Sequence, residues 1–269
     1  MPAKINFSEE EIKQIIEERT IYKRPYYKIA ELYHVTEKVI VRIIKEKLGE
    51  DNRQKIKINH NFDRFYFYDI DSADKAYWLG FITADGYVNE KKNFLKIKLQ
   101  YVDKEHLSKF LKAIKADETI KVKTEYHSVT GKPASYITLN GIDFINGLIK
   151  QGVRQAKSSK EVPCENVPDK FIPDYIRGLI DGDGHICKRK MDLRGSYIMC
   201  KWVQDWLIKN CNVGVTKISY DSNIYRVYFI KNRINVLRKL YYVGLNKNIC
   251  LDRKYKEAMI LMLENLKKS

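Results

Sequence analysis

Two aspartates stand at equivalent places in a nine-residue pattern that occurs twice in the chain. The first copy reads Trp-Leu-Gly-Phe-Ile-Thr-Ala-Asp-Gly over residues 78–86, and the second reads Ile-Arg-Gly-Leu-Ile-Asp-Gly-Asp-Gly over residues 176–184. Each copy places an aspartate, Asp85 or Asp183, at its eighth position. Two carboxylates brought close together repel each other unless protons or cations intervene. Paired divalent metals at such acids are a standard arrangement for hydrolysis of phosphodiester bonds, so the pattern predicts a metal site.

Each copy is predicted to be the end of a helix, because apolar residues precede the aspartate and a glycine that can adopt positive φ follows it. Gly80 and Ala84 are four residues apart, as are Gly178 and Gly182, so each pair shares one helix face. Small side chains on that face permit two helix backbones to approach closely. Packing through these faces would bring the two aspartates side by side.

An Asp-Gly pair also occurs where a core helix simply turns, and in the calcium-binding loop of an EF-hand. A turn accounts for one copy alone, but it does not account for two copies flanked by the same elements. The EF-hand alternative requires further ligands and a closing glutamate, which are missing after residue 181. The duplication therefore favours a paired-acid site.

The residues that follow each motif alternate between strand and helix patterns. In residues 94–100, Leu and Ile alternate with Lys and Gln, which is typical of a strand with one buried face. The predicted strands are 94–100, 119–126, 135–140, 186–193, 216–220 and 224–229, and the predicted helices are 103–115, 142–150, 196–210 and 234–240. The fold class is therefore α+β, with tandem pseudo-symmetric αββαββα repeats and a small all-α N-terminal domain.

The N-terminal domain is predicted to contain three helices, over residues 9–19, 26–33 and 36–48. Residues 29–39 resemble a helix-turn-helix, although His34 stands where glycine is usual. The third helix would then be the recognition helix in a DNA groove. A small helical cap or a dimerisation element is the alternative. The basic residues that this helix would present to DNA are Lys38, Arg42 and Lys45.

The segments divide the chain into five parts. Residues 161–173 hold three of the chain's six prolines, which indicates a linker between the two repeats. The predicted parts are a helix-turn-helix-like DNA-binding domain over 1–50, a linker over 51–71, the first repeat over 72–160, the inter-repeat linker over 161–172 and the second repeat over 173–269.

The charge of the chain predicts a polyanionic partner. Fifty basic residues against 34 acidic ones give a formal net charge of +16, and residues 184–269 alone hold 18 basic and 6 acidic side chains. Charge by itself does not separate DNA from RNA or an anionic membrane. A twisted antiparallel sheet with polar side chains on its solvent face fits a DNA major groove, although such side chains are also the ordinary solvated side of an amphipathic strand. The candidates for a DNA-binding face are Lys96, Lys98, Gln100, Lys121, Lys123, Lys188, Lys190, Lys217 and Arg226.

Other composition features exclude several classes of protein. The five cysteines are an odd number without a CxxC pair, which argues against a disulfide framework or a structural zinc site. Apolar runs end well before about 18 residues, and the first residues lack a signal-peptide pattern. We therefore expect a soluble, cytoplasmic protein without a membrane partner.

The two nonapeptides resemble the signature of the LAGLIDADG homing endonucleases, in the single-chain form with two repeats. The resemblance covers roughly residues 62–269. It implies that Asp85 and Asp183 are catalytic residues that bind Mg²⁺ or Mn²⁺. The backbone carbonyl before each acid, of Ala84 or Gly182, is a further metal ligand by the same resemblance.

The resemblance extends to two lysines and departs from the family at three motif positions. It implies that Lys157 and Lys254 are catalytic residues that organise water or offset phosphate charge during cleavage. Without the family, both would be interpreted as surface lysines. Thr83 stands where the sixth position is commonly Asp, and Leu79 and Arg177 stand where the second is commonly Ala.

The function implied by the resemblance is site-specific hydrolysis of both strands of double-stranded DNA by a monomer of mobile-element type. Family members cut across the minor groove and leave short 3′ overhangs. One alternative is a transcriptional regulator of the same fold with vestigial acids, against which both intact Asp-Gly pairs argue. The other is an intron RNA maturase. A helix-turn-helix favours duplex DNA, because the major groove of A-form RNA is too narrow for such a helix.

Overall fold

The computed structural model describes residues 7–22, 24–48, 62–155, 160–242 and 244–267. The chain divides into two compact units, Met1–His60 and Asn61–Ser269. This division falls within the predicted linker 51–71, of which residues 51–61 lie outside the described part. Among the described residues, no helix is both long and apolar enough to span a bilayer.

The smaller unit contains three helices, which lie within two residues of the predicted ones. Their bounds are α1 Glu9–Thr20, α2 Tyr26–Leu32 and α3 Glu37–Leu48. Ile15, Ile29, Ile40 and Ile44 are almost completely buried between them. The turn between α2 and α3 contains His34 with φ of +53°, a conformation that glycine adopts more readily. The unusual residue of this turn therefore adopts the backbone geometry that glycine usually provides.

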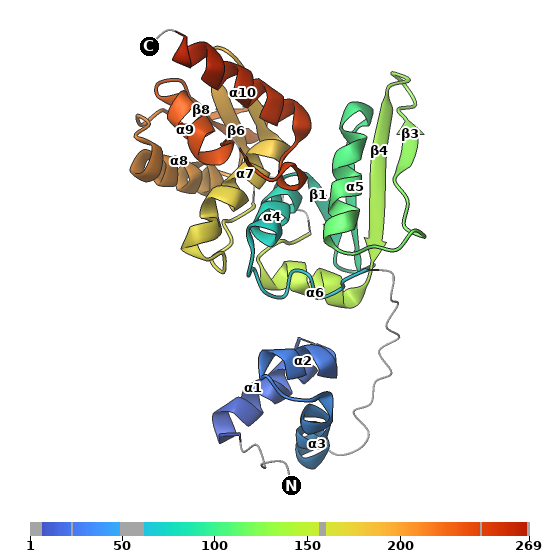
Figure 1. The fold of residues 1–269 in the computed structure, drawn as a ribbon. Helices are drawn as coiled ribbons and strands as arrows, with labels where there is room; N and C mark the ends of the chain where they lie inside the picture. The colour runs from blue at the N-terminus through green and yellow to red at the C-terminus, as the bar shows by residue number, and fades with distance from the viewer. Residues whose placement is uncertain (1–6, 23, 49–61, 156–159, 243, 268–269) are drawn as a thin grey trace. The chain divides into compact units, whose positions relative to one another are not determined.

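The larger unit contains the predicted αββαββα order twice (Figure 1). The first repeat consists of α4 Ala73–Asp85, β1 Gly86–Asn89, β2 Phe94–Gln100, α5 Lys104–Ala113, β3 Lys123–Tyr126, β4 Pro133–Asn140 and α6 Ile142–Lys150. The second consists of α7 Ile172–Asp183, β5 Gly184–Ile186, β6 Met191–Gly195, α8 Tyr197–Cys211, β7 Ser219–Asp221, β8 Ile224–Phe229 and α9 Arg233–Leu240. Helix α10, Asp252–Leu266, follows the second repeat.

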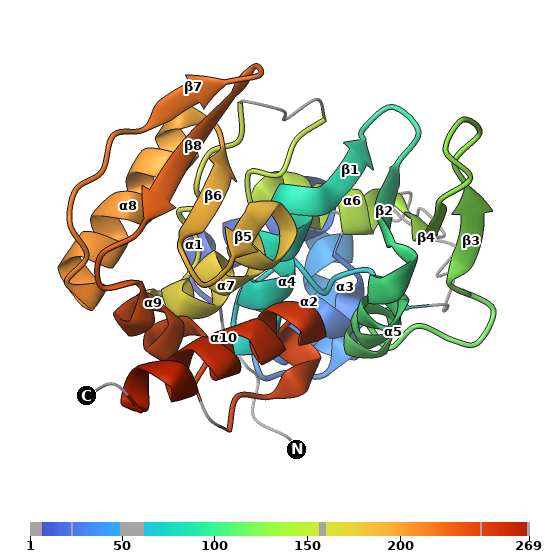
Figure 2. The same ribbon diagram turned by 90° about the horizontal axis from the view of Figure 1, so that it is seen from above.

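The two sheets have the same topology. Both are antiparallel, with strand orders β1-β2-β4-β3 and β5-β6-β8-β7. Seen from above, β1 and β5 lie innermost and β3 and β7 lie at the outer ends (Figure 2). Helices α5 and α6 pack on the first sheet and α8 on the second. We call the opposite side of each sheet, which carries Lys98 in the first sheet and Arg226 in the second, its free face.

One hydrophobic core joins both repeats, with α4 and α7 at its centre. Eight consecutive residues of α4, from 76 to 83, are buried, as are eight of α7, from 174 to 181. Burial on all sides is what a helix at the centre of a domain requires. The two motif helices are therefore fixed by the largest packed region of the chain.

The glycine after each aspartate differs from the prediction. Gly86 has φ of −77° and Gly184 has φ of −92°, so neither adopts the predicted positive φ. Both residues instead begin a strand, β1 or β5, directly after the helix. A Cβ at Gly86 would lie 2.7 Å from the carbonyl oxygen of Ile82, and one at Gly184 would lie 2.6 Å from that of Ile180. Glycine is required here because a Cβ would come too close to these carbonyl oxygens, and not because the backbone has positive φ.

Several predicted strands also differ from the observed ones. The predicted strand 186–193 is a hairpin, closed where the N–H of Cys187 donates to the carbonyl oxygen of Lys190 over 3.0 Å. Its turn contains three adjacent basic residues, 188–190, which are therefore not part of one extended strand. The predicted strand 119–126 begins only at Lys123, and β1, β5 and α10 were not predicted individually. All five cysteines are free, as expected.

Candidate metal and nucleic-acid site

The two motif helices approach each other as closely as backbone permits. A Cβ at Gly80 would lie 2.1 Å from the carbonyl oxygen of Tyr175, and a Cβ at Gly178 would lie 2.1 Å from that of Tyr77. Real Cβ atoms do not come so near to another atom, so no other residue fits at either position without moving a helix. The small residues singled out from the sequence are therefore at the helix contact.

The same contact continues to the ends of both helices, where the aspartates lie. A Cβ at Gly182 would lie 2.3 Å from the Cβ of Ala84 and 3.5 Å from Cγ of Asp85. Asp85 and Asp183 are the last residues of α4 and α7, and both are half-buried. Tyr87 and His185, two residues further along, are on the free faces. The fold thus brings together two acids, the carbonyls before them and the inner edges of both sheets.

Lys254 donates hydrogen bonds to backbone carbonyls on both sides of Asp183 in the sequence. Its Nζ donates to the carbonyl oxygens of Ile180 at 2.5 Å, Asp181 at 2.7 Å and Gly184 at 2.7 Å. The carbonyl oxygen of Gly182, a predicted metal ligand, lies 3.4 Å from the same Nζ. An ammonium group has three protons, so these carbonyls use its full donor capacity. Lys254 therefore stabilises the junction of α7 and β5.

The environment of Lys254 changes its acidity. The side chain is almost fully buried, and burial lowers its pKa from 10.5 to about 8, although Asp181, Asp85 and Asp183 favour the charged form. A cation here also offsets the negative end of the α7 dipole. Both predicted metal-binding acids are thus electrostatically coupled to one lysine.

Asp181, which occupies the sixth motif position, is the centre of a buried polar network that sequence reasoning missed. Its Oδ2 accepts from the hydroxyl of Tyr77 at 2.8 Å and from the N–H of Leu251 at 2.7 Å, and its Oδ1 accepts from Tyr241 at 2.6 Å. Desolvation raises the pKa of Asp181. The Leu251 bond fixes the start of α10, which carries Lys254. In the first copy, Thr83 instead donates to the carbonyl of Leu79 within its own helix.

Arg177, which stands at the second motif position where Ala is common, is completely buried beside this network. Its Nε donates to the carbonyl oxygen of Ile249 at 2.8 Å and its Nη1 to that of Leu240 at 3.1 Å. Its Nη2 lies 2.6 Å from the carboxylate of Asp174. Arg177 therefore ties α7 to the segment between α9 and α10.

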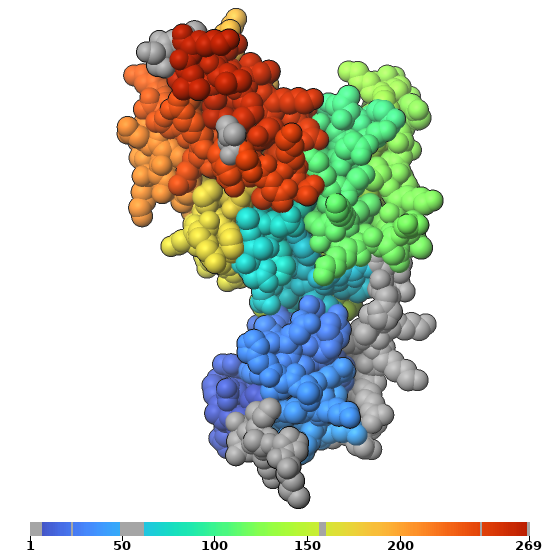
Figure 3. Space-filling view, viewed as in Figure 1, coloured from blue at the N-terminus to red at the C-terminus, as the bar shows by residue number. Residues whose placement is uncertain are grey.

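Two ion pairs connect the start of α10 to the first repeat. Arg253 donates to both carboxylate oxygens of Asp103, at 2.9 and 3.1 Å. Lys109 of α5 lies 2.8 Å from Asp252 and also donates to the carbonyl oxygen of Cys250. In the space-filling view, the red surface at the start of α10 meets the green surface of α5 (Figure 3). The segment that positions Lys254 is thus held by both repeats.

On the first sheet, strand register places four of the predicted DNA contacts on one face. Lys98 pairs with Tyr136 on β4, and Tyr136 pairs with Lys123 on β3, so these residues share the free face. Lys96 and Gln100 follow by the alternation of β2. Lys121 is exposed, lies before β3 and is outside the sheet.

On the second sheet, the predicted contacts are more scattered. Arg226 pairs with Arg194 across β6 and β8 on the free face, and Arg194 was not predicted. Lys190 is in the hairpin turn and lies 4.6 Å from the ring centroid of Tyr228. Lys188 points toward α10, where it lies 3.2 Å from Glu264. Lys217 is exposed ahead of β7.

In the smaller unit, the three residues that are predicted to contact DNA lie on one side of α3. Lys38 and Arg42 are exposed and Lys45 is half-buried, at a spacing of four and then three residues. Such a spacing places side chains on one helix face. Nε of Arg42 lies 3.9 Å from Glu46, within the same helix. Lys157, the remaining predicted catalytic residue, lies outside the described residues.

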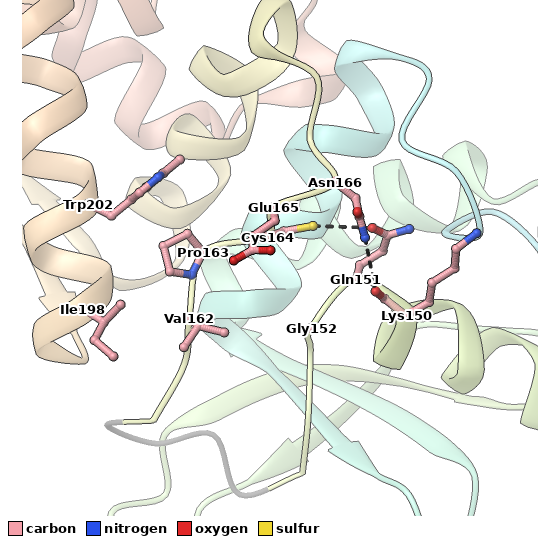
Figure 4. A pocket seen from close by; sticks show the side chains of 10 residues that line it. All are labelled: Lys150, Gln151, Gly152, Val162, Pro163, Cys164, Glu165, Asn166, Ile198 and Trp202. Atoms are coloured by element: carbon pink, nitrogen blue, oxygen red, sulfur yellow. Dashed lines mark hydrogen bonds between the residues drawn. The ribbon is translucent and has the colours of Figure 1, made fainter.

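A hollow of about 490 Å³ lies between the inter-repeat linker and α8 (Figure 4). Two of its lining residues are hydrogen-bonded to each other, since Sγ of Cys164 donates to Oε1 of Gln151 over 3.4 Å. Neither motif aspartate lines it. The hollow is therefore separate from the acid pair. Its lining consists of Lys150, Gln151, Gly152, Val162, Pro163, Cys164, Glu165, Asn166, Ile198 and Trp202.

Several solved structures are similar to this chain in fold, whereas no protein family and no curated protein matches the sequence. Full-length DUF199/WhiA from Thermatoga maritima is 13% identical, with a TM-score of 0.44 over 74% of this chain and 66% of that one, so this chain spans about two thirds of its length. Variants of the homing endonuclease I-DmoI are 16% identical, with a TM-score of 0.45 over 68% of this chain and 99% of theirs. The homing endonuclease I-WcaI, bound to its DNA recognition sequence, is 12% identical, with a TM-score of 0.45 over 81% and 96%. At these identities, the similarity shows the fold alone and not the function.

Proposed function

We propose that this chain is a site-specific endonuclease that hydrolyses both strands of double-stranded DNA with a divalent metal at Asp85 and Asp183. The observation that carries the proposal is the meeting of two acid-bearing helix ends, where the place of a Cβ at Gly182 is only 3.5 Å from Cγ of Asp85. Contact between the two acid-bearing helix ends supports a shared task for the two carboxylates, because a simple turn after each helix would not require such contact.

The oxygen ligands at this place suit Mg²⁺ or Mn²⁺. In the described part of the chain, no cluster of three or more His, Cys, Asp or Glu side chains could hold a metal. Mg²⁺ is commonly bound by one or two carboxylates together with water and phosphate oxygens. The two aspartates, with the carbonyls of Ala84 and Gly182 as further candidates, match this preference. A bound divalent ion would polarise the phosphodiester and favour formation of a nucleophilic hydroxide.

The residues around the acids have supporting tasks in this proposal. Lys254 holds the α7–β5 junction, so that Asp183 keeps its position and the repulsion between the acids is reduced. Asp181 holds the start of α10 and thereby Lys254. Both are positioning residues in this assignment, whereas Lys157 remains a candidate for contact with water or phosphate.

The two free faces supply the surface for duplex DNA. Each begins beside one aspartate and presents basic side chains, joined on the first sheet by the amide of Gln100, and these groups suit phosphate oxygens and base edges in a major groove. The α3 side of the smaller unit offers a second, separate surface of the same chemistry. Together they would allow an extended DNA site to be recognised while cleavage occurs between the two sheets.

The test is to incubate the full chain and Mg²⁺ with a library of randomised duplexes and to sequence the ends that form. We expect cuts at fixed positions within one sequence motif, on both strands, and none for Asp85→Asn. Selective binding without cleavage by the unaltered chain would instead support the transcriptional regulator. Binding restricted to structured RNA would support the maturase.

A further inference from the structure

Glu125 lies between two lysines on the free face of the first sheet. Its Oε1 is 2.6 Å from Nζ of Lys98, and its Oε2 is 3.7 Å from Nζ of Lys96. Glu125 is on β3 and both lysines are on β2, so these ion pairs extend across β4. Its partner on β4 is Ala134, whose short side chain leaves room for these ion pairs. The hydrogen bond from Lys98 holds the pKa of Glu125 below its usual value.

The second sheet also has an acid between two basic groups, but this acid is covered. Asp192 lies 3.7 Å from Nζ of Lys190 and 3.9 Å from Nε of Arg226. Its side chain is 3% exposed, whereas that of Glu125 is 36% exposed. Only Glu125 is open to a molecule that lies on its sheet.

A carboxylate that solvent can reach is unfavourable beside the phosphates of DNA but can recognise a base. Phosphate contacts need cations, and a negative group among them weakens attraction to every sequence alike. In the major groove, however, a carboxylate matches the exocyclic amino group of cytosine, which donates a hydrogen bond. Lys96 and Lys98 remain beside Glu125 and offset its repulsion from the DNA backbone.

We propose that Glu125 is a specificity-determining residue that accepts a hydrogen bond from the N4 amino group of a cytosine in duplex DNA bound on the first sheet. This proposal rests on the proposed function, because it requires DNA on the free face. Asp192 orders Lys190 and Arg226 and contacts no base. The two acids therefore differ in task because they differ in exposure.

The experiment is affinity selection from a randomised duplex library with the full chain carrying Asp85→Asn, so that bound duplexes stay intact. The parent selects cytosine at one position. Adding Glu125→Ala removes that preference, weakens binding to the parent's best sequence by about 10- to 100-fold and strengthens binding to random duplex. Glu125→Gln shifts the preference toward adenine, which pairs with glutamine in the major groove.

Two variants serve as controls in the same selection. Asp192→Asn weakens binding to all sequences alike. Asp205→Asn removes an acid from the exposed ion pair with Lys201 on α8, on the covered side of the second sheet, and leaves the selected sequence unchanged. Equal thermal unfolding of the Glu125 variants and the parent shows that they are folded, since Glu125 is half-buried at the surface of the sheet and outside the hydrophobic core.

The possible failures are distinguishable. If Glu125→Ala selects the same base at every position as the parent, Glu125 only holds the lysines, and the inference is overturned while the proposed function stands. If the parent selects no duplex sequence, the proposed function is overturned and this inference with it.

Discussion

Nζ of Lys254 lies 2.7 Å from the carbonyl oxygen of Gly184, the residue that follows Asp183. This bond joins the first turn of α10 to the point where a motif helix becomes a strand. Because α10 is also paired with the first repeat through Arg253 and Asp103, the position of one acid depends on contacts from both halves of the chain.

Replacing either motif aspartate by asparagine should separate cleavage from binding. Asp85→Asn or Asp183→Asn removes a charged oxygen ligand but keeps the side-chain shape and both free faces. Cleavage should fall by at least about 100-fold, since metal assistance contributes several kcal/mol to the barrier, while duplex affinity persists. Asp205→Asn is the control for loss of one negative charge. Near-normal cleavage by either motif variant would remove that aspartate from the site.

The helix contact should tolerate no side chain at Gly178. In Gly178→Ala, the new Cβ would stand 2.1 Å from the carbonyl oxygen of Tyr77, so α4 and α7 must separate. The free energy of unfolding should drop by about 3 kcal/mol or more, at the upper end of overpacking effects. Gly214→Ala is the matched control, because a Cβ there meets no atom within 4 Å. Urea unfolding of both variants measures the difference, and equal stabilities would contradict the packing.

Asp181 should be sensitive to the loss of its acceptors rather than of its charge. Asp181→Ala leaves the hydroxyl of Tyr241 and the N–H of Leu251 without this partner, at about 1–3 kcal/mol for each buried donor. The hydroxyl of Tyr77 keeps its contact with Nε2 of His106, 2.9 Å away. Asp181→Asn keeps the shape and one acceptor, so it should lose less stability. Thermal unfolding of the two variants compares them. A milder effect of alanine than of asparagine would show that the network contributes little.

The buried Lys254 predicts a rise of stability with pH. Its pKa is about 8 in the folded chain, against an ordinary value of 10.5. Between these values the unfolded chain retains a proton that the folded chain has released, so the unfolding free energy rises with pH, by up to about 1.4 kcal/mol per pH unit. The difference between the unaltered chain and Lys254→Met should therefore grow from pH 8 to pH 10 in urea unfolding. A difference independent of pH would contradict the lowered pKa.

The sequence predicted those features that repeat or alternate. The strand and helix patterns after each motif indicated the αββαββα order. The duplicated motif indicated the close helix contact at Gly80 and Gly178, because small residues on one helix face permit two backbones to approach closely. The half-buried strand 94–100 followed from strict alternation of Lys with Leu and Ile. These patterns are local, so they can be recognised without knowing the fold.

The features that depend on distant contacts could not be predicted in the same way. Asp181 binds Tyr241, 60 residues further along the chain, and Arg177 binds Ile249, 72 residues further along, and nothing near either residue in the sequence specifies these distant partners. The burial of Lys254 had no local signal either. The strands β1 and β5 were missed because they are short and begin inside the motif, where the glycine suggested a helix end with positive φ.

The last prediction separates the two units of the chain. Deleting residues 1–60 should weaken duplex binding and shorten the protected DNA on one side only, because a tethered second module raises the local concentration of the other at its site. The cleavage position and the rate of cleavage at saturating protein should remain, since Asp85, Asp183 and Lys254 all belong to the larger unit.

Arg42→Ala should reproduce part of the loss of affinity, at about 1–3 kcal/mol if the side chain contacts a base, whereas Lys13→Ala on α1 serves as its exposed control. Footprinting with the full and shortened chains measures the protected length. An unchanged footprint and affinity would show that the three N-terminal helices have a role other than binding DNA.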